Sequence, residues 1–107
     1  MTGRRLSVEE AGALVIGTLM RCRTSKANAE AVARALVGAE LAGQAGHGLR
    51  RLAAYAAQSM AGKVDGMAVP AAEWTRPGAL AVAAAHGFAF PAIELAVERL
   101  PGAARRQ

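Results

Sequence analysis

The chain has 107 residues, of which 53% are hydrophobic and 4% aromatic, and it carries a formal net charge of +5. This length accommodates one small domain, and because much of the apolar content is alanine, we expect a thin core and a chain that packs against something else. The arginines gather at the termini and in short doublets, not in a stripe with interleaved aromatic residues, which argues against a nucleic-acid-binding surface.

Two helices are predicted in the first part of the chain. The run SVEE at Ser7–Glu10 is a capping box, in which the serine hydroxyl accepts from the glutamate amide and the glutamate reaches back. A second helix should begin near residue 24 or 25 and run to about Ala42, with Gly43 as its stop. Apolar residues recur at helical spacing and predict one buried face in each helix. These faces are Val8, Ala11, Leu14, Val15, Thr18 and Leu19, and then Ala29, Val32, Ala33, Leu36 and Val37.

A third helix should begin at or just after His47 and run to Met60 or Ala61, with Gly62 following it. At 100° per residue, two faces separate on this helix. The apolar face is Leu49, Leu52, Ala53, Ala56 and Met60, and the opposite face is His47, Arg51, Tyr55 and Gln58. We therefore expect the second face to point away from the helix's own core.

After Lys63 the spacing no longer fits a helix. The run VDGMAVP predicts a turn and an extended connector, and AAEWTRPGALAVAAAHG predicts two short strands broken at Pro77–Gly78. Helical spacing returns from Phe88 to about Ala104. The predicted fold class is α+β and mostly helical, with about four helices and two short strands.

The last predicted helix has an apolar face and an acidic outer side. Pro101–Gly102 should end it early. The apolar face is Ile93, Ala96, Val97 and Leu100, and the outer side carries Glu94 and Glu98 one turn apart.

The run GQAGHGLRRL is the best candidate for a functional site. It sets His47 between Gly46 and Gly48, which let a substrate approach closely, and a helix N-terminus favours the neutral imidazole that acid–base catalysis needs. Arg51, four residues on, can grip a carboxylate with two parallel hydrogen bonds, and Tyr55 is a candidate wall of the site. The alternatives are a capping or solvated histidine, a solvated arginine and a half-buried packing tyrosine.

Other chemistries find little support in the sequence. Cys22 is the single cysteine, so an intrachain disulfide and a thiol-rich metal site are excluded, and His86, expected in a turn, has no metal-ligand spacing to the other histidine. Neither a phosphate-binding glycine loop nor a GxSxG nucleophile elbow is present. With no secretory signal and no apolar run that could span a membrane, we expect a cytoplasmic protein.

The run AELAGQAGHGLRRLAAY resembles the N-terminal segment of the type-2 malate/L-lactate dehydrogenase family, whose pattern there is approximately A-D-L-x-G-x-x-S-H-G-x-x-R-x-x-x-Y. The matching positions are Ala39, Leu41, Gly43, His47, Gly48, Arg51 and Tyr55, with Glu40 in place of the acid. The flanking helices, GKVD and GALAVAAAHGFAFPAIELAVERL also follow the family's order, so the resemblance spans nearly the whole chain. Members are NAD(P)-dependent oxidoreductases with a fold unlike that of the Rossmann dehydrogenases.

The resemblance implies a role for each residue of the run. His47 is the proton donor and acceptor, Arg51 binds the substrate carboxylate, and hydride moves between the nicotinamide of NAD or NADP and the carbon bearing oxygen or nitrogen. The implied substrates are small 2-hydroxy acids and 2-keto or 2-imino acids, and members are usually homodimers. Gly46 stands where the family has a serine thought to orient the histidine.

The same resemblance predicts that residues 1–107 are the N-terminal, substrate-side helical domain of a larger oxidoreductase, without its cofactor-binding domain and inactive alone. The alternative is a small protein-interaction or helix-turn-helix DNA-binding module, in which Arg50 and Arg51 meet phosphates. Two features argue against DNA binding. The connection before the third helix is long, and the third helix lacks side chains that could read bases. A third interpretation is a degenerate paralogue that dimerises with a full-length partner.

Overall fold

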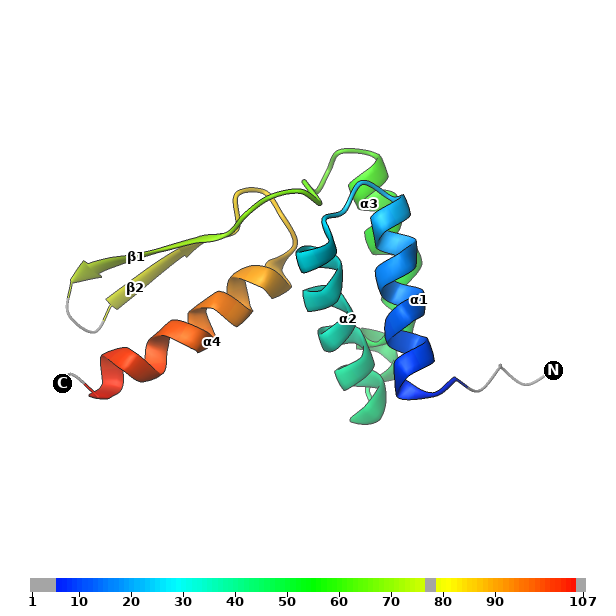
Figure 1. The fold of residues 1–107 in the computed structure, drawn as a ribbon, viewed down its shortest axis with the longest axis horizontal. Coiled ribbons are helices and arrows are strands. Elements are labelled where there is room, and N and C mark those ends of the chain that lie inside the picture. The colour runs from blue at the N-terminus through cyan, green and yellow to red at the C-terminus, as the bar shows by residue number, and fades with distance from the viewer. Residues whose placement is uncertain (1–5, 77–78, 106–107) are drawn as a thin grey trace.

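The computed structural model describes residues 6–76 and 79–105. In Figure 1, helices α1 to α3 form a bundle in which α2 and α3 pack against α1, and a two-stranded hairpin with α4 forms an arm beside it. The elements are α1 (Val8–Arg21), α2 (Lys26–Leu41), η1 (Ala45–His47), η2 (Leu49–Arg51), α3 (Leu52–Met60), β1 (Ala71–Arg76), β2 (Ala79–Ala83) and α4 (Ala89–Arg105), where η marks a short 3-10 turn. The predicted α+β class, with its four helices and two strands, is confirmed for the described residues.

Local signals set the start of α1 and the ends of α2 and α3 as predicted. The Ser7 hydroxyl accepts from the Glu10 amide and the Glu10 carboxylate accepts from the Ser7 amide, each at 3.0 Å, which confirms the capping box. The amide hydrogen bond from Ser7, followed by the one from its hydroxyl, lowers the pKa of Glu10. Gly43 and Gly62 follow α2 and α3 with φ of 79° and 78°, the left-handed conformation that ends helices.

The core lies between α1 and α2 and is closed by one residue from the base of the arm. Its buried members are Val15, Leu19, Ala29, Val32, Ala33, Leu36 and Phe88. The predicted buried face of α2 is confirmed throughout, whereas Val8 and Leu14 of α1 are exposed and Thr18 is half-buried. α1 is buried along the narrow stripe Ala11, Val15 and Leu19, so apolar residues to either side of this stripe stay uncovered.

The predicted start of the third helix is wrong. α3 begins at Leu52, and the preceding residues form the 3-10 turns η1 and η2 on either side of Gly48. Gly48 has φ −98° and ψ −137°, values far from helical, so it separates the two turns. His47 is therefore the last residue of a 3-10 turn and does not lie at the N-terminus of an α-helix.

The predicted faces of the third helix are correct only in part. Leu49, Leu52 and Ala56 pack against the core as expected, but Ala53 and Met60 are exposed. Tyr55, which was expected on the outward face, packs against the core and makes edge-to-face contacts with Phe88 and Phe90, with ring centroids 5.8 and 6.0 Å apart. The two phenylalanines come from the arm. They cover a side of α3 that the periodicity of the α3 sequence predicts to face solvent.

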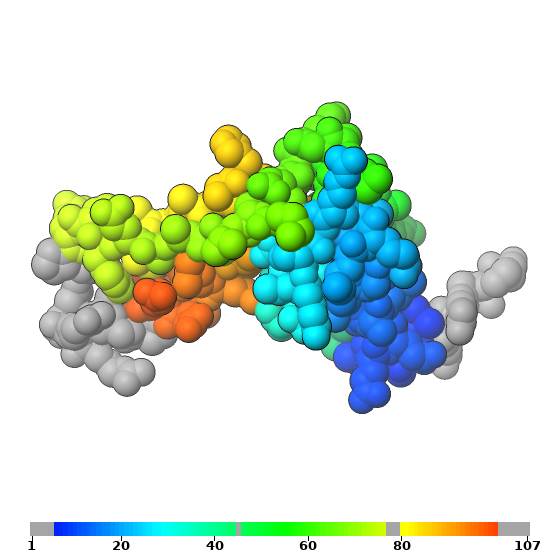
Figure 2. Space-filling model, turned by 45° about the horizontal axis from the view of Figure 1, so that its top comes forward, coloured from blue at the N-terminus to red at the C-terminus, as the bar shows by residue number. Residues whose placement is uncertain are grey.

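The arm consists of α4 and the two predicted strands, which form a hairpin, while the predicted break at Pro77–Gly78 lies outside the described residues. The strands are antiparallel, pairing Ala71 with Ala83 and Arg76 with Ala79. α4 continues through Pro101 to Arg105, so the predicted early end is wrong, because a proline removes one helical N–H bond but its own φ is compatible with a helix. Figure 2 shows the hairpin and α4 projecting beyond the bundle. No helix in the described ranges is long and apolar enough to span a membrane.

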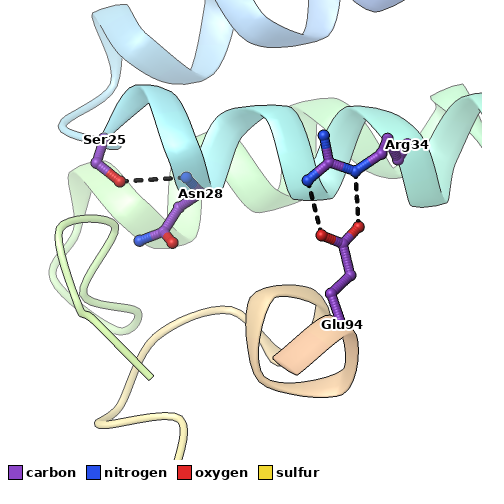
Figure 3. Close-up of polar contacts among 4 residues, drawn as sticks. All are labelled: Ser25, Asn28, Arg34 and Glu94. Atoms are coloured by element: carbon purple, nitrogen blue, oxygen red, sulfur yellow. Dashed lines mark hydrogen bonds and ion pairs between the residues drawn. The ribbon is translucent and has the colours of Figure 1, made fainter. Parts of the chain in front are cut away.

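Two polar contacts fasten α2 to later parts of the chain. Arg34 donates from Nε and Nη2 to the two carboxylate oxygens of Glu94, at 2.8 and 2.7 Å, as Figure 3 shows. Glu94 therefore faces α2 and does not lie on an outer side of α4, which corrects the prediction. The buried Asn28 donates from Nδ2 to the carbonyls of Gly66 and Ala68, at 2.9 and 2.7 Å, and so holds the connector that leads to β1.

Candidate functional site

The candidate residues other than Tyr55 lie on the tight turn between α2 and α3. After α2, the His47 amide donates to the Gln44 carbonyl at 2.9 Å and closes η1, and the Arg51 amide donates to the Gly48 carbonyl at 2.9 Å and closes η2. We call residues 44–51 the histidine turn. Its backbone hydrogen bonds join residues three positions apart. Two 3-10 turns therefore stand where the spacing predicted a continuous helix.

His47 stands on the open side of the histidine turn. The residue is exposed, as is Gly46 before it, and a Cβ built on Gly46 would meet nothing within 4 Å. A ligand can therefore approach the imidazole from solvent past the preceding glycine. The expected influence of a helix dipole on the imidazole has no basis here, since α3 begins only at Leu52.

Arg51 is tied to the residue that precedes the histidine. Its Nε donates to the Gly46 carbonyl at 2.9 Å, and the residue is otherwise exposed. Since this bond uses Nε, the terminal Nη1 and Nη2 groups keep their geometry for two parallel hydrogen bonds to a carboxylate. The structure thus brings Arg51 and the backbone next to His47 together, through a side-chain bond that helical spacing does not predict.

Gly48 is buried against the end of α2. A Cβ built on it would lie 2.6 Å from Cγ and 2.7 Å from Oε1 of Glu40, so only a glycine fits without displacing that side chain. Glu40 Oε1 also accepts a hydrogen bond from the Leu49 amide at 3.0 Å. The histidine turn is therefore held to α2 by a glutamate.

Tyr55 takes the packing role that sequence analysis left as its alternative. Its contacts with Phe88 and Phe90 hold the ring on the core side of α3. Among the contacts described, none joins its ring to the histidine turn. Its role as a wall of the site stays a prediction.

A shallow hollow opens beside the histidine turn. It measures about 230 Å³ and lies between the start of α1, the end of α2 and Leu49, with Glu40 in its wall. His47 and Arg51 do not line it. The second histidine, His86, lies in a turn with φ 66°, as predicted, and its carbonyl accepts from the Asp65 amide at 2.9 Å.

The sequence pattern does not predict the two α2 side chains that hold later segments in place, Glu40 at the histidine turn and Asn28 at the connector to β1. Glu40 was noted only as an acid within a pattern, and its contact with Leu49 lies nine residues further along the chain. Asn28 was not singled out, although an amide beside the apolar stripe of a helix is a signal that a buried polar partner is needed. Neither partner could be named from helical periodicity.

Comparison with known proteins places the whole described chain in one group. The family model for malate/L-lactate dehydrogenase matches residues 6–107. The chain is 43% identical over 96 residues to the (2R)-3-sulfolactate dehydrogenase (NADP(+)) of Chromohalobacter salexigens, covering 90% of this chain and 28% of that protein. It is 39% identical over 101 residues to a delta(1)-pyrroline-2-carboxylate reductase of Ancylobacter novellus, covering 94% of this chain and 30% of that protein.

Solved structures agree with this result. The delta1-piperideine-2-carboxylate reductase from Pseudomonas syringae superposes with a TM-score of 0.90 at 30% identity, covering 97% of this chain and 31% of that one. A malate dehydrogenase from Pyrococcus horikoshii shares the fold, with a TM-score of 0.87 at 19% identity and coverage of 97% and 30%. The chain therefore spans about three tenths of the length of the relatives that it matches.

Proposed function

Because the chain belongs to the malate/L-lactate dehydrogenase family, we propose that it forms the N-terminal, substrate-side part of an NAD(P)-dependent oxidoreductase. The reaction would interconvert 2-hydroxy acids with 2-keto acids, or amino acids with 2-imino acids. The observation that carries the proposal is the histidine turn, in which the Arg51 side chain bonds to the Gly46 carbonyl beside His47. An acid–base group and a carboxylate-binding group are thereby held on one exposed turn.

In this proposal Arg51 and His47 each have one task. Arg51 holds the substrate carboxylate through its terminal amino groups, which fixes the orientation of the carbon to be reduced. His47 donates a proton to the carbonyl oxygen or imine nitrogen during reduction, and takes it back during oxidation. The open space beside Gly46 leaves room for the substrate.

The nicotinamide cofactor would supply or accept the hydride when bound. The hollow beside Glu40 is lined mainly by apolar side chains and by no arginine or lysine, so it does not suit the phosphates of a dinucleotide. The proposal assigns no cofactor contact to this chain. In the whole protein, the contacts would come from the length of the relatives that this chain does not span.

The substrate class is a small carboxylic acid, which accords with the names of the relatives. By resemblance to the family we also propose a cytoplasmic homodimer for the whole protein. The alternative helix-turn-helix function is not favoured, because Arg51 bonds to the protein's own backbone and the segment before α3 is a pair of 3-10 turns.

A chimera tests the proposal. Residues 6–107 replace the matching segment of the (2R)-3-sulfolactate dehydrogenase, and reduction of NADP+ with (2R)-3-sulfolactate is measured. We expect an active chimera in which His47→Ala lowers kcat by about 100-fold or more, as for loss of a general acid–base group. Arg51→Ala should mainly raise KM, because it removes the carboxylate grip.

The matched controls are the second histidine and the neighbouring arginine. His86→Ala and Arg50→Ala should leave kcat and KM within about two-fold, as for ordinary surface changes. An active chimera in which His47→Ala and His86→Ala behave alike would overturn the proposed role. Turnover of 2-keto acids with NADPH by the isolated chain would overturn the proposal that it lacks a cofactor site.

A further inference from the structure

We propose that Glu40 is the positioning residue of the histidine turn, acting from α2 to fix where His47 and Arg51 stand. The inference rests on the proposed function, because it concerns the same site. Glu40 itself has no assigned role in the reaction, and it acts through the backbone of Leu49 and the space left by Gly48.

The first observation is a hydrogen bond between distant parts of the chain. Glu40 Oε1 accepts from the Leu49 amide at 3.0 Å, and the two residues are nine positions apart. Leu49 is the first residue of η2, so its amide has no partner within that turn. A carboxylate satisfies this donor with a charge-assisted bond, which is stronger than a bond to a neutral acceptor.

The second observation is the fit of Glu40 against Gly48. The three atoms nearest to a Cβ built on Gly48 are Cγ, Oε1 and Cδ of Glu40, at 2.6, 2.7 and 2.8 Å. The glutamate therefore fills the space that any larger residue would need. Contact with Gly48 and the bond to Leu49 together fix the Gly48–Leu49 peptide, one residue after His47.

The third observation links the contacts of Glu40 with Gly48 and Leu49, here called the Glu40 clamp, to Arg51. The Arg51 amide donates to the Gly48 carbonyl and Arg51 Nε donates to the Gly46 carbonyl, both at 2.9 Å. The arginine thus bonds to the turn on both sides of His47, while Glu40 bonds to its middle. Loss of the Glu40 contact should let the whole turn move relative to α2, including the guanidinium.

The test follows the turn directly by NMR of the 107-residue chain. The variants are Glu40→Ala, which removes the acceptor, and Glu40→Gln, which keeps an oxygen of similar reach. Glu30→Ala is the matched control, since Glu30 is a half-buried glutamate on the same helix. Two signals are recorded, which are the exchange rate of the Leu49 amide and the chemical shift of the Arg51 Nε–H.

In Glu40→Ala the Leu49 amide should exchange about tenfold faster, the size expected for loss of one hydrogen bond to a charged group. The Arg51 Nε–H signal should move toward its position in an unstructured peptide, while exchange at Leu36 in the core stays unchanged. Glu40→Gln should restore both signals for the most part, and Glu30→Ala should change neither. A purely structural loss would instead accelerate Leu36 and Leu49 together.

Gly48→Ala provides a second, independent variant. It should displace the Glu40 carboxylate and reproduce the Glu40→Ala spectrum, and combining the two changes should add little. Unchanged Leu49 exchange in Glu40→Ala, or equal acceleration at Leu36, overturns the positioning role. These signals do not depend on turnover. Failure of the chimera experiment would therefore overturn the proposed function, whereas the role of Glu40 is decided by the exchange rate of the Leu49 amide.

Discussion

The bundle and the arm are stabilised in different ways. In the bundle, Val15, Leu19, Val32 and Leu36 are fully buried at the α1–α2 interface. In the arm, none of the side chains described in β1, β2 and α4 is buried. The bundle therefore has its own hydrophobic core, whereas the arm depends on contacts at its base.

The contacts of the arm are few and lie near its junction with the bundle. Phe88, directly before α4, enters the core, and the ion pair of Arg34 with Glu94 lies one turn into the helix. On either side of Glu94 along α4, Ile93 and Val97 are 54% and 63% exposed. The difference agrees with the thin core expected from an alanine-rich composition. The buried apolar side chains lie mainly in α1 and α2, and none of those described lies in β1, β2 or α4.

The largest expected effect is a direct comparison of the two regions. Leu36→Ala should lower the free energy of unfolding by about 3 kcal/mol, since the residue is fully buried in the bundle. Ile93→Ala in the arm should change it by less than about 0.5 kcal/mol, because the side chain stays in water. Urea unfolding followed by circular dichroism measures both. Equal losses would mean that α4 is as tightly packed as the bundle.

A smaller effect is expected at the junction between the regions. Asn28→Ala should cost about 2 kcal/mol, because it leaves the carbonyls of Gly66 and Ala68 without their donor in a buried place. The matched control is Lys26→Ala, an exposed change on the same helix, which should be nearly neutral. If Asn28→Ala were also neutral, the connector would have to be held by other contacts.

How far the fold could be predicted depended on the distance between contacting residues. The cap at Ser7 and the stops at Gly43 and Gly62 were predictable because each involves neighbours within one turn. The α2 stripe was predictable for the same reason. The side of α4 that carries Glu94 was not, since its partner Arg34 lies 60 residues earlier.

The site shows the same division. The spacing of His47 and Arg51 predicts a shared helix face, which is wrong, because the structure places both residues in 3-10 turns before α3. The helix is interrupted at Gly48, where Glu40 approaches from α2, and periodicity carries no information about such a contact. Helical periodicity places Tyr55 on the outer face of the third helix. It carries no information about Phe88 and Phe90, which come from the arm and cover the tyrosine ring. The chemical roles of His47 and Arg51 remain predictions.

The next effect tests α2, the bundle helix to which the arm is fastened by Arg34 and Glu94. Ser25 caps α2, its hydroxyl accepting from the Asn28 amide at 3.2 Å. Ser25→Ala should cost about 1 kcal/mol, while Ser25→Asp, which keeps an accepting oxygen, should restore most of it. Thermal unfolding measured by calorimetry resolves this difference. Equal stability of the alanine and aspartate variants would mean that the cap does not contribute.

The smallest effect concerns the ion pair that fastens the arm. Glu94→Gln should cost no more than about 0.5 kcal/mol, because the Arg34 and Glu94 side chains are 61% and 42% exposed and solvent screens the pair. The matched control is Glu98→Gln, one turn along α4, which should have no measurable effect. High salt should reduce the cost of Glu94→Gln further.

The pH dependence of this pair follows from the pKa of Glu94. Hydrogen bonds from Arg34 lower that pKa below its ordinary value, and the pair raises the pKa of Arg34. The carboxylate thus binds protons less tightly in the folded state, so its contribution to stability is present above the unfolded pKa and is lost as pH falls through the folded one. Urea unfolding of the parent chain and Glu94→Gln should therefore differ at neutral pH and converge in acid. A difference that persisted after Glu94 was protonated would mean that the glutamine variant loses packing and that the arm is not fastened by charge.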